Sequence, residues 1–126
     1  MTDIAFVSCR PISGGAGEAP ARRREVVLNG KRVKTVDIHA HCAVPEAMAL
    51  LGRKVEAEGL LQSRMADRLR AMDEQGIDVE ALSINPIWYT LERDLVTKVV
   101  SVQNEKLAEL SAANPERFVA FASVAL

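Results

Sequence analysis

The sequence predicts an α/β fold built on a parallel sheet, and two observations lead to this prediction. Segments with the residue pattern of strands alternate with segments that have the pattern of helices, in the order strand, helices, strand, helix, strand. Such alternation is typical of βα units around a parallel sheet rather than of a helical bundle or a β-sandwich. In addition, 48% of the 126 residues are hydrophobic and 26% are charged, which is the composition of a soluble globular domain.

The first part of the chain predicts a tail followed by a hairpin. Residues 1–24 contain proline, glycine and an arginine triplet with almost no apolar periodicity. We therefore predict a mobile tail over residues 1–24, outside a domain formed by residues 25–126. The hairpin follows, because Asn29-Gly30 supplies the positive φ angles that a two-residue turn requires. Its second arm is expected to run as one strand over residues 31–39.

The middle of the chain predicts two helices and a strand. A short helix is expected over residues 45–51, with Pro45 in its first turn. A clearer helix is expected over residues 64–75, where Gly76 fits a left-handed stop. Residues 77–84 then have the pattern of a buried strand.

The last part of the chain predicts a long helix and a final strand. The helix is expected over residues 90–113, and its inward stripe consists of Leu95, Val99, Val102 and Leu110. Residues 117–126 form a nearly continuous apolar run, typical of a strand that is covered on both faces. A chain that stops on such a strand exposes unpaired backbone groups, which natural domains usually avoid, so we expect more chain to follow.

The charge balance excludes several classes of partner. The chain has 16 Lys and Arg against 17 Asp and Glu, and a sequence pI of about 6.1. This balance offers no general attraction to nucleic acid or to an anionic membrane surface. The basic run from Arg22 to Lys34 is interpreted as a solvated tail rather than a nucleic-acid contact. Without a long apolar segment or a disulfide framework, the chain is expected to be cytoplasmic.

Both histidines of the chain lie in one short motif, His39-Ala40-His41. On an extended strand this spacing puts two imidazoles on the same face, where they can converge on one metal ion. The alternative is that one or both are hydrogen-bonded polar residues at a strand end, and the motif alone does not decide between the two. His-x-His also occurs in cupins and in the metallo-β-lactamase fold, but a helical continuation fits neither well.

Three nearby residues are weighed as parts of the same site. Asp37 lies two residues before His39, so regular alternation puts it on the same face, where it can orient an imidazole from behind; the alternative is an ordinary strand-end Asp. Cys42 is expected to point to the opposite face as a small buried residue rather than to act as a soft ligand. Trp88 follows a predicted strand on the side where parallel folds place their sites, so it either lines a substrate pocket or packs in the core.

Several segments taken in order resemble the amidohydrolase superfamily. They are Val-Asp-Ile-His-Ala-His over residues 36–41, Arg-Leu-Arg-Ala-Met-Asp-Glu-Gln-Gly-Ile-Asp over residues 68–78, Asn-Glu-Lys-Leu-Ala-Glu over residues 104–109 and Asn-Pro-Glu-Arg-Phe over residues 114–118. More narrowly, the chain is similar to the aminocarboxymuconate-semialdehyde decarboxylase-like branch, also called amidohydrolase family 2. The resemblance covers about residues 33 to 126.

The resemblance implies a metal-dependent (β/α)8 TIM barrel, of which this chain is the N-terminal part. Such a barrel takes about 250 residues or more, so the chain would supply about three βα units of the eight. By position, His39 and His41 match the first two ligands of a divalent ion, usually zinc. The further His and Asp ligands come from later strands and match nothing here, so the chain by itself is expected to be inactive.

The implied reaction is the non-oxidative decarboxylation of a small aromatic or unsaturated carboxylic acid. Metal-dependent hydrolysis of a C–O, C–N or C–C bond is the runner-up, because the acid/base residue would come from strands that this chain lacks. A third interpretation belongs to another class. In it the chain is a truncated, non-catalytic α/β piece that persists by pairing its exposed edge strands with a partner or with another copy, as a homo-oligomer.

Overall fold

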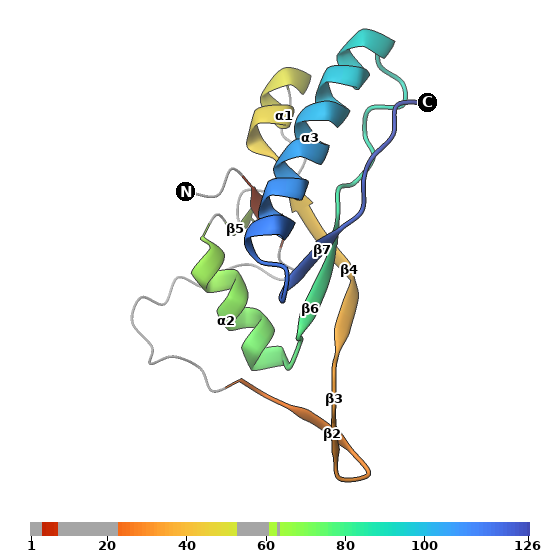
Figure 1. The fold of residues 1–126 in the computed structure, drawn as a ribbon. Helices are drawn as coiled ribbons and strands as arrows, with labels where there is room; N and C mark the ends of the chain where they lie inside the picture. Colours follow the sequence, from red (N-terminus) through yellow and green to blue (C-terminus); the bar gives the residue numbers. More distant parts are fainter. Residues whose placement is uncertain (1–3, 8–22, 53–60, 63) are drawn as a thin grey trace.

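The computed structural model describes residues 4–7, 23–52, 61–62 and 64–126, and Figure 1 shows their arrangement. In this part of the chain the sheet has the strand order β5-β1-β4-β6-β7, and β4, β6 and β7 run parallel. The mixed α/β architecture with a parallel sheet is therefore confirmed. The elements are β1 (Ala5–Val7), β2 (Val26–Leu28), β3 (Lys31–Val33), β4 (Val36–Ala43), α1 (Pro45–Leu51), β5 (Leu61–Gln62), α2 (Met65–Gln75), β6 (Val79–Ser83), α3 (Arg93–Ala113) and β7 (Phe118–Ala120).

The predicted hairpin is confirmed, and it projects from one end of the molecule (Figure 1). Its turn has φ angles of 49° at Asn29 and 75° at Gly30, which is the left-handed conformation expected for Asn-Gly. The second arm is shorter than predicted, because β3 ends at Val33 and a separate strand, β4, begins at Val36. The hairpin thus forms its own two-stranded sheet, beside the five-stranded one.

The prediction of a tail through residue 24 is wrong for residues 4–7. These residues contain β1, which pairs antiparallel with β4 and with β5. Ile4, Ala5 and Phe6 are buried, and the Phe6 ring stacks on Phe118 with 5.6 Å between centroids. The physical reason is the short apolar run at 4–7, because burial of its side chains is favourable even though the sequence around it is polar. Residues 8–22 of the predicted tail lie outside the described residues.

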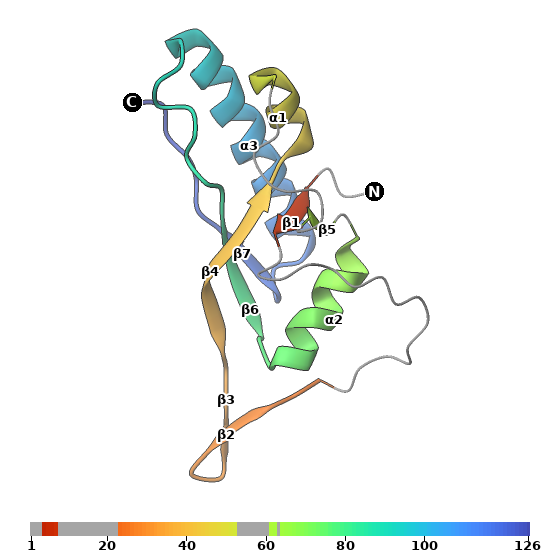
Figure 2. The same ribbon diagram turned by 180° about the vertical axis from the view of Figure 1, so that it is seen from behind.

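The hydrophobic core lies on one face of the sheet. Helix α3 packs against α1 and against β7, and Figure 2 shows α1 and α3 together at the end of the molecule away from the hairpin. The predicted inward stripe of α3 is confirmed, since it faces the core. Val99 and Leu110 are buried, and Leu95 and Val102 are partly buried against the core. None of the described helices is long and apolar enough to cross a membrane.

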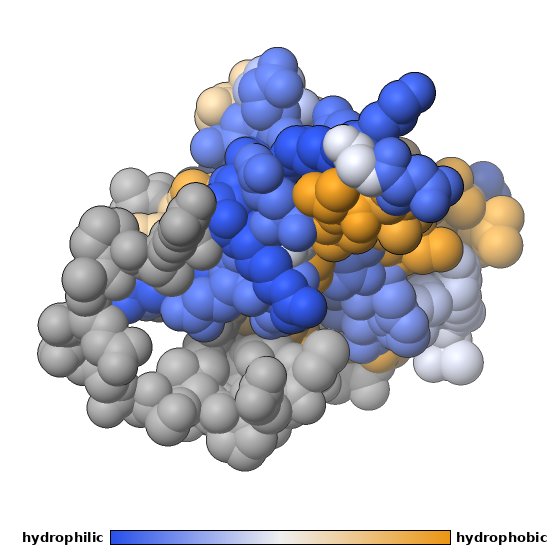
Figure 3. Space-filling view, turned by 90° about the horizontal axis from the view of Figure 1, so that it is seen from below, coloured by the Kyte–Doolittle hydropathy of each residue, from blue (hydrophilic) through white to orange (hydrophobic). Residues whose placement is uncertain are grey.

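The opposite face of the parallel strands carries exposed apolar side chains on either side of β6. Val36 and Val119, in register with the buried Val79 and Ala81 of β6, are 52% and 48% exposed, and Ile38 at the irregular part of β4 is 75% exposed. The expectation that residues 117–126 form a strand covered on both faces is therefore wrong, because the strand is limited to β7 and Val119 points to solvent. In the view from below in Figure 3, hydrophobic atoms gather in a patch bordered by hydrophilic ones. We call the surface formed by Val36, Ile38 and Val119 the open sheet face.

Candidate metal centre

A β-bulge in β4 sets the direction of the side chains in the His-x-His motif. Asp37 is in register with Glu80 of β6, but three residues later Ala40 is in register with Leu82, so β4 carries one extra residue between them. Asp37 and Ala40 therefore face the same side of the sheet as Glu80 and Leu82. His41, in register with Ser83, faces the other side.

His39 and His41 lie side by side, as their spacing predicts. Their ring centroids are 4.8 Å apart and the ring planes are nearly perpendicular, at 88°. His39 is exposed and His41 is partly buried. The pair stands on the open sheet face, towards the carboxyl end of β4, where parallel α/β folds place their sites.

Ser83 contacts His41 from the neighbouring strand. Its Oγ lies 3.2 Å from Nδ1 of His41 and 3.5 Å from the carbonyl oxygen of Ala40. Sequence reasoning missed this residue, although it lies within the predicted buried strand and ends β6 in the structure. The missing signal is the strand register, because only the pairing of β4 with β6 places Ser83 opposite His41.

Asp37 does not share the face of the histidines, so the expectation of regular alternation is wrong at this position. The bulge is the physical reason, since one extra residue reverses the direction of every side chain beyond it. The Asp37 carboxylate instead accepts a hydrogen bond from the backbone N–H of His39, at 2.9 Å. Asp37 thus contacts the backbone at the bulge, through which it can influence the placement of His39.

Cys42 is buried on the opposite face, next to the buried pair Arg68 and Glu80. Its thiol donates a hydrogen bond to the carbonyl oxygen of Ser83 at 3.7 Å. Burial raises the pKa of this thiol to about 12, so the soft thiolate form that binds metals is disfavoured. The preference for a small buried residue over a ligand is supported.

Trp88 is 1% exposed and belongs to the hydrophobic core. Its ring lies 5.8 Å from that of the half-exposed Tyr89. The indole Nε1 is buried and makes no hydrogen bond within the described structure. Trp88 therefore packs in the core, and a role in substrate binding stays a prediction.

The donors present fit a divalent ion in kind but do not complete its coordination. Two neutral imidazoles are ligands that zinc accepts readily, and protein zinc sites use three or four protein ligands. Within the described part of the chain, no group of three or more His, Cys, Asp or Glu side chains is placed to hold a metal ion. His39 and His41 would therefore supply two of the ligands that such a site needs.

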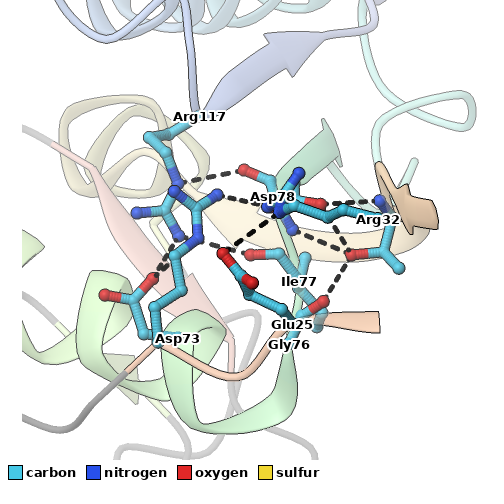
Figure 4. A network of polar contacts seen from close by, with 9 residues as sticks. Glu25, Arg32, Asp73, Gly76, Ile77, Asp78 and Arg117 are labelled. Atoms are coloured by element: carbon cyan, nitrogen blue, oxygen red, sulfur yellow. Dashed lines mark hydrogen bonds and ion pairs between the residues drawn. The ribbon is translucent and has the colours of Figure 1, made fainter. Parts of the chain in front are cut away.

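A network of charged residues lies at the opposite end of β6 and holds the hairpin to the domain (Figure 4). Asp78 accepts hydrogen bonds from the backbone N–H of Thr35 at 2.8 Å, from Arg23 at 2.5 Å and from Arg32. The bond from the Thr35 backbone foremost, and then the guanidinium of Arg32, lower the pKa of Asp78 to about 2, although burial opposes the change. Arg117 binds Asp73 nearby, at 2.8 Å. The network explains why the hairpin stays attached to the sheet.

The chain is partly similar to a solved structure. The chain is similar to the crystal structure of 2,6-dihydroxybenzoate decarboxylase complexed with 2,6-dihydroxybenzoate, with a TM-score of 0.48 and 27% sequence identity. The match covers 71% of this chain and 29% of that chain. No protein-family model and no curated protein matches the chain.

Proposed function

We propose that this chain supplies the first two ligands of a divalent metal centre, with zinc as the preferred ion, in an amidohydrolase-like decarboxylase. The substrate class is a small aromatic or unsaturated carboxylic acid. The observation that carries the proposal is the pair of imidazoles at His39 and His41, with 4.8 Å between ring centroids, at the end of a parallel strand. The resemblance of the surrounding sequence to amidohydrolases adds the reaction class.

The residues of this chain have separate roles in the proposed centre. His39 and His41 offer ring nitrogens to the ion, and Asp37 holds the backbone N–H of His39 at the bulge. A divalent ion, when bound, supplies a Lewis acid that polarises a carboxylate or carbonyl oxygen. Further ligands and the acid/base group come from residues outside this chain in the proposal. Trp88 is kept in the proposal as a substrate-binding candidate, and its buried side chain follows β6 in the sequence.

Zinc binding by the chain tests the metal part of the proposal. We expect weak binding of one ion per chain, because two imidazoles leave the coordination incomplete. Either His39→Ala or His41→Ala should abolish it, whereas the exposed-carboxylate control Glu116→Gln should leave it unchanged. Isothermal titration with zinc measures all four proteins. Equal binding by the wild type and both histidine variants contradicts the proposed ligands.

The activity part of the proposal is tested on the native protein. An antibody raised against residues 43–75 isolates it from source cells, and intact mass, metal content and CO2 release are measured. We expect a species about twice this length or longer, as a barrel of about 250 residues requires. Its metal should be stoichiometric, and 2,6-dihydroxybenzoate is a reasonable first substrate. Product analysis separates decarboxylation from the runner-up, hydrolysis of a C–O, C–N or C–C bond.

A second candidate function is self-association without catalysis. The open sheet face favours it, because Val36, Ile38 and Val119 present exposed apolar side chains on neighbouring strands. A second copy of the chain could cover this surface. A stable oligomer without bound metal, in the native protein, would favour this candidate over the enzyme.

A further inference from the structure

We propose that Ser83 is a positioning residue of the metal centre, whose hydroxyl holds the proton of the neutral His41 ring on Nδ1 and leaves the Nε2 lone pair free for a divalent ion. The role of Ser83 in metal binding rests on the proposed function. The tautomer of His41 is independent of that function, because it follows from contacts within the metal-free chain.

The contacts of the Ser83 hydroxyl decide where its proton goes. Oγ lies between two groups, the carbonyl oxygen of Ala40 at 3.5 Å and Nδ1 of His41 at 3.2 Å. A hydroxyl has one proton to donate and lone pairs to accept with, whereas a carbonyl oxygen only accepts. Both contacts are hydrogen bonds only if Ser83 donates to Ala40 and accepts from an N–H at Nδ1 of His41. If Ser83 donated its proton to Nδ1 of His41 instead, no proton would lie between its Oγ and the carbonyl oxygen of Ala40.

Ser83 is held firmly enough to impose this arrangement. It is the last residue of β6, and its backbone is in register with His41 of β4. On the other side of the sheet, the thiol of the buried Cys42 donates to the Ser83 carbonyl. The consecutive residues His41 and Cys42 of β4 therefore both contact Ser83, from opposite faces of the sheet. His41 cannot rotate away from Ser83 without losing a hydrogen bond in a partly buried site.

The tautomer matters because a neutral imidazole binds a metal ion through its unprotonated nitrogen. The partner of the other nitrogen selects which one that is. Within the part of the chain that the structure describes, Ser83 contacts the ring of His41, whereas the ring of His39 has no hydrogen bond. Ser83 would thus make His41 the preorganised ligand of the pair.

Ring-nitrogen NMR of the metal-free chain tests the tautomer directly. The chain has only two histidines, so long-range ¹H–¹⁵N spectra at alkaline pH, where imidazoles are neutral, resolve four ring nitrogens. The variant His39→Gln assigns the signals of His41. We expect the Nδ1–H form to dominate at His41 in the wild type and to lose its dominance in Ser83→Ala. Ser83→Thr keeps the hydroxyl and should restore it.

Two controls separate positioning from general damage to the fold. Ser101→Ala removes an exposed serine hydroxyl on α3, which bonds to Glu105 instead of to a histidine, and should leave the His41 signals unchanged. Trp88 is the one tryptophan of the chain and is buried in the core. Its fluorescence therefore reports whether Ser83→Ala still packs as the wild type does. The Ser83→Thr rescue excludes loss of packing as the cause in any case.

Zinc affinity, measured in the same variants, links the inference to the metal. We expect Ser83→Ala to weaken binding by about tenfold, the lower end of the effect of removing a partner of a ligating histidine, and Ser83→Thr to recover it. An unchanged His41 tautomer in Ser83→Ala overturns the inference, even if zinc still binds through both histidines. A tautomer that changes in a chain that binds no zinc supports the positioning by Ser83 and counts against the proposed function instead.

Discussion

At the scale of single residues, Asp78 connects the hairpin to the sheet. It is nearly buried, and it accepts hydrogen bonds from the Thr35 backbone, from Arg23 and from Arg32. These partners come from the hairpin and the residues on either side of it. One carboxylate therefore carries much of the attachment between hairpin and sheet, and the pH dependence of stability should show it.

We predict that Asp78 makes the protein lose stability in acid. Its pKa is lowered from 3.8 to about 2 in the folded state, so its contribution is complete above the unfolded value of 3.8 and is lost as pH falls through 2. A difference of this size corresponds to about 2 kcal/mol in the free energy of unfolding. Urea unfolding of the wild type and of Asp78→Asn between pH 7 and pH 2 measures this contribution. The difference between their free energies of unfolding should shrink as pH falls.

The control for this prediction is Asp67→Asn, whose carboxylate lies on the surface of α2 near Arg64. It should change stability by no more than about 1 kcal/mol, the upper end of what exposed ion pairs contribute, and this change should vary less with pH than that of Asp78→Asn. A gap between the wild type and Asp78→Asn that stays constant down to pH 2 would show that the carboxylate charge is not the source.

At the scale of elements, helix α2 is joined to β6 through a buried ion pair. Nε of Arg68 lies 2.8 Å from Oε2 of Glu80, and both side chains are buried. Arg68 also donates to the carbonyl oxygen of Val7 in β1, at 3.3 Å, and its guanidinium lies 5.6 Å from the centre of the Phe6 ring. Burial raises the pKa of Glu80, which Arg68 opposes.

Removal of Arg68 alone should destabilise the protein strongly. Arg68→Met leaves the Glu80 carboxylate buried without its partner, which costs about 3 to 5 kcal/mol. The double variant Arg68→Met with Glu80→Gln should recover part of this loss, because no charge then stays buried. Urea unfolding at pH 7 and at pH 5 checks both. The single variant should lose less at pH 5, where Glu80 takes up a proton more readily than an ordinary glutamate.

The helix ends give a matched pair of glycines. Gly52 after α1 and Gly76 after α2 have φ angles of 65° and 76°. A Cβ at Gly52 would meet open space, whereas at Gly76 it would lie 3.3 Å from the carbonyl oxygen of Arg24. Gly52→Ala should therefore cost about 1 kcal/mol from the left-handed backbone alone, and Gly76→Ala should cost more. Thermal unfolding of the two variants measures the difference, and equal losses would show that the contact with Arg24 gives way freely.

The elements that local chemistry determines are the ones that sequence predicted well. Asn29-Gly30 determines its turn, and Gly52 and Gly76 end their helices, because each needs only the φ angles of its own residues. The bulge in β4 depends instead on pairing with β6, a partner that is distant in sequence. Strand β1 likewise forms only because β4 and β5 offer it edges. The same limit explains why the two histidines were found and Ser83 was not.

At the scale of the whole molecule, the two sides of the sheet differ. The core packs α1 and α3 against the face that carries Leu82 and Phe118, whereas His41, Val36 and Val119 lie on the other face, and Ile38 at the bulge is exposed. In the proposed enzyme that face would look into the interior of a barrel. In the isolated chain it is an apolar surface on neighbouring strands, which soluble proteins rarely leave exposed.

We therefore predict that the isolated chain associates through the open sheet face. Ile38 is its most exposed member at 75%, and a charge there should hinder contact between two apolar surfaces. Sedimentation at increasing protein concentration should show oligomers of the wild type and a monomer, or much weaker association, for Ile38→Lys. Leu28→Lys is the matched control, because Leu28 is also an exposed hydrophobic residue, at 60%, but lies on the hairpin. If Leu28→Lys reduces association as much as Ile38→Lys does, general hydrophobicity rather than this face drives it. If the wild type stays monomeric at every concentration, the apolar face is not an association surface and the self-associating candidate function fails with it.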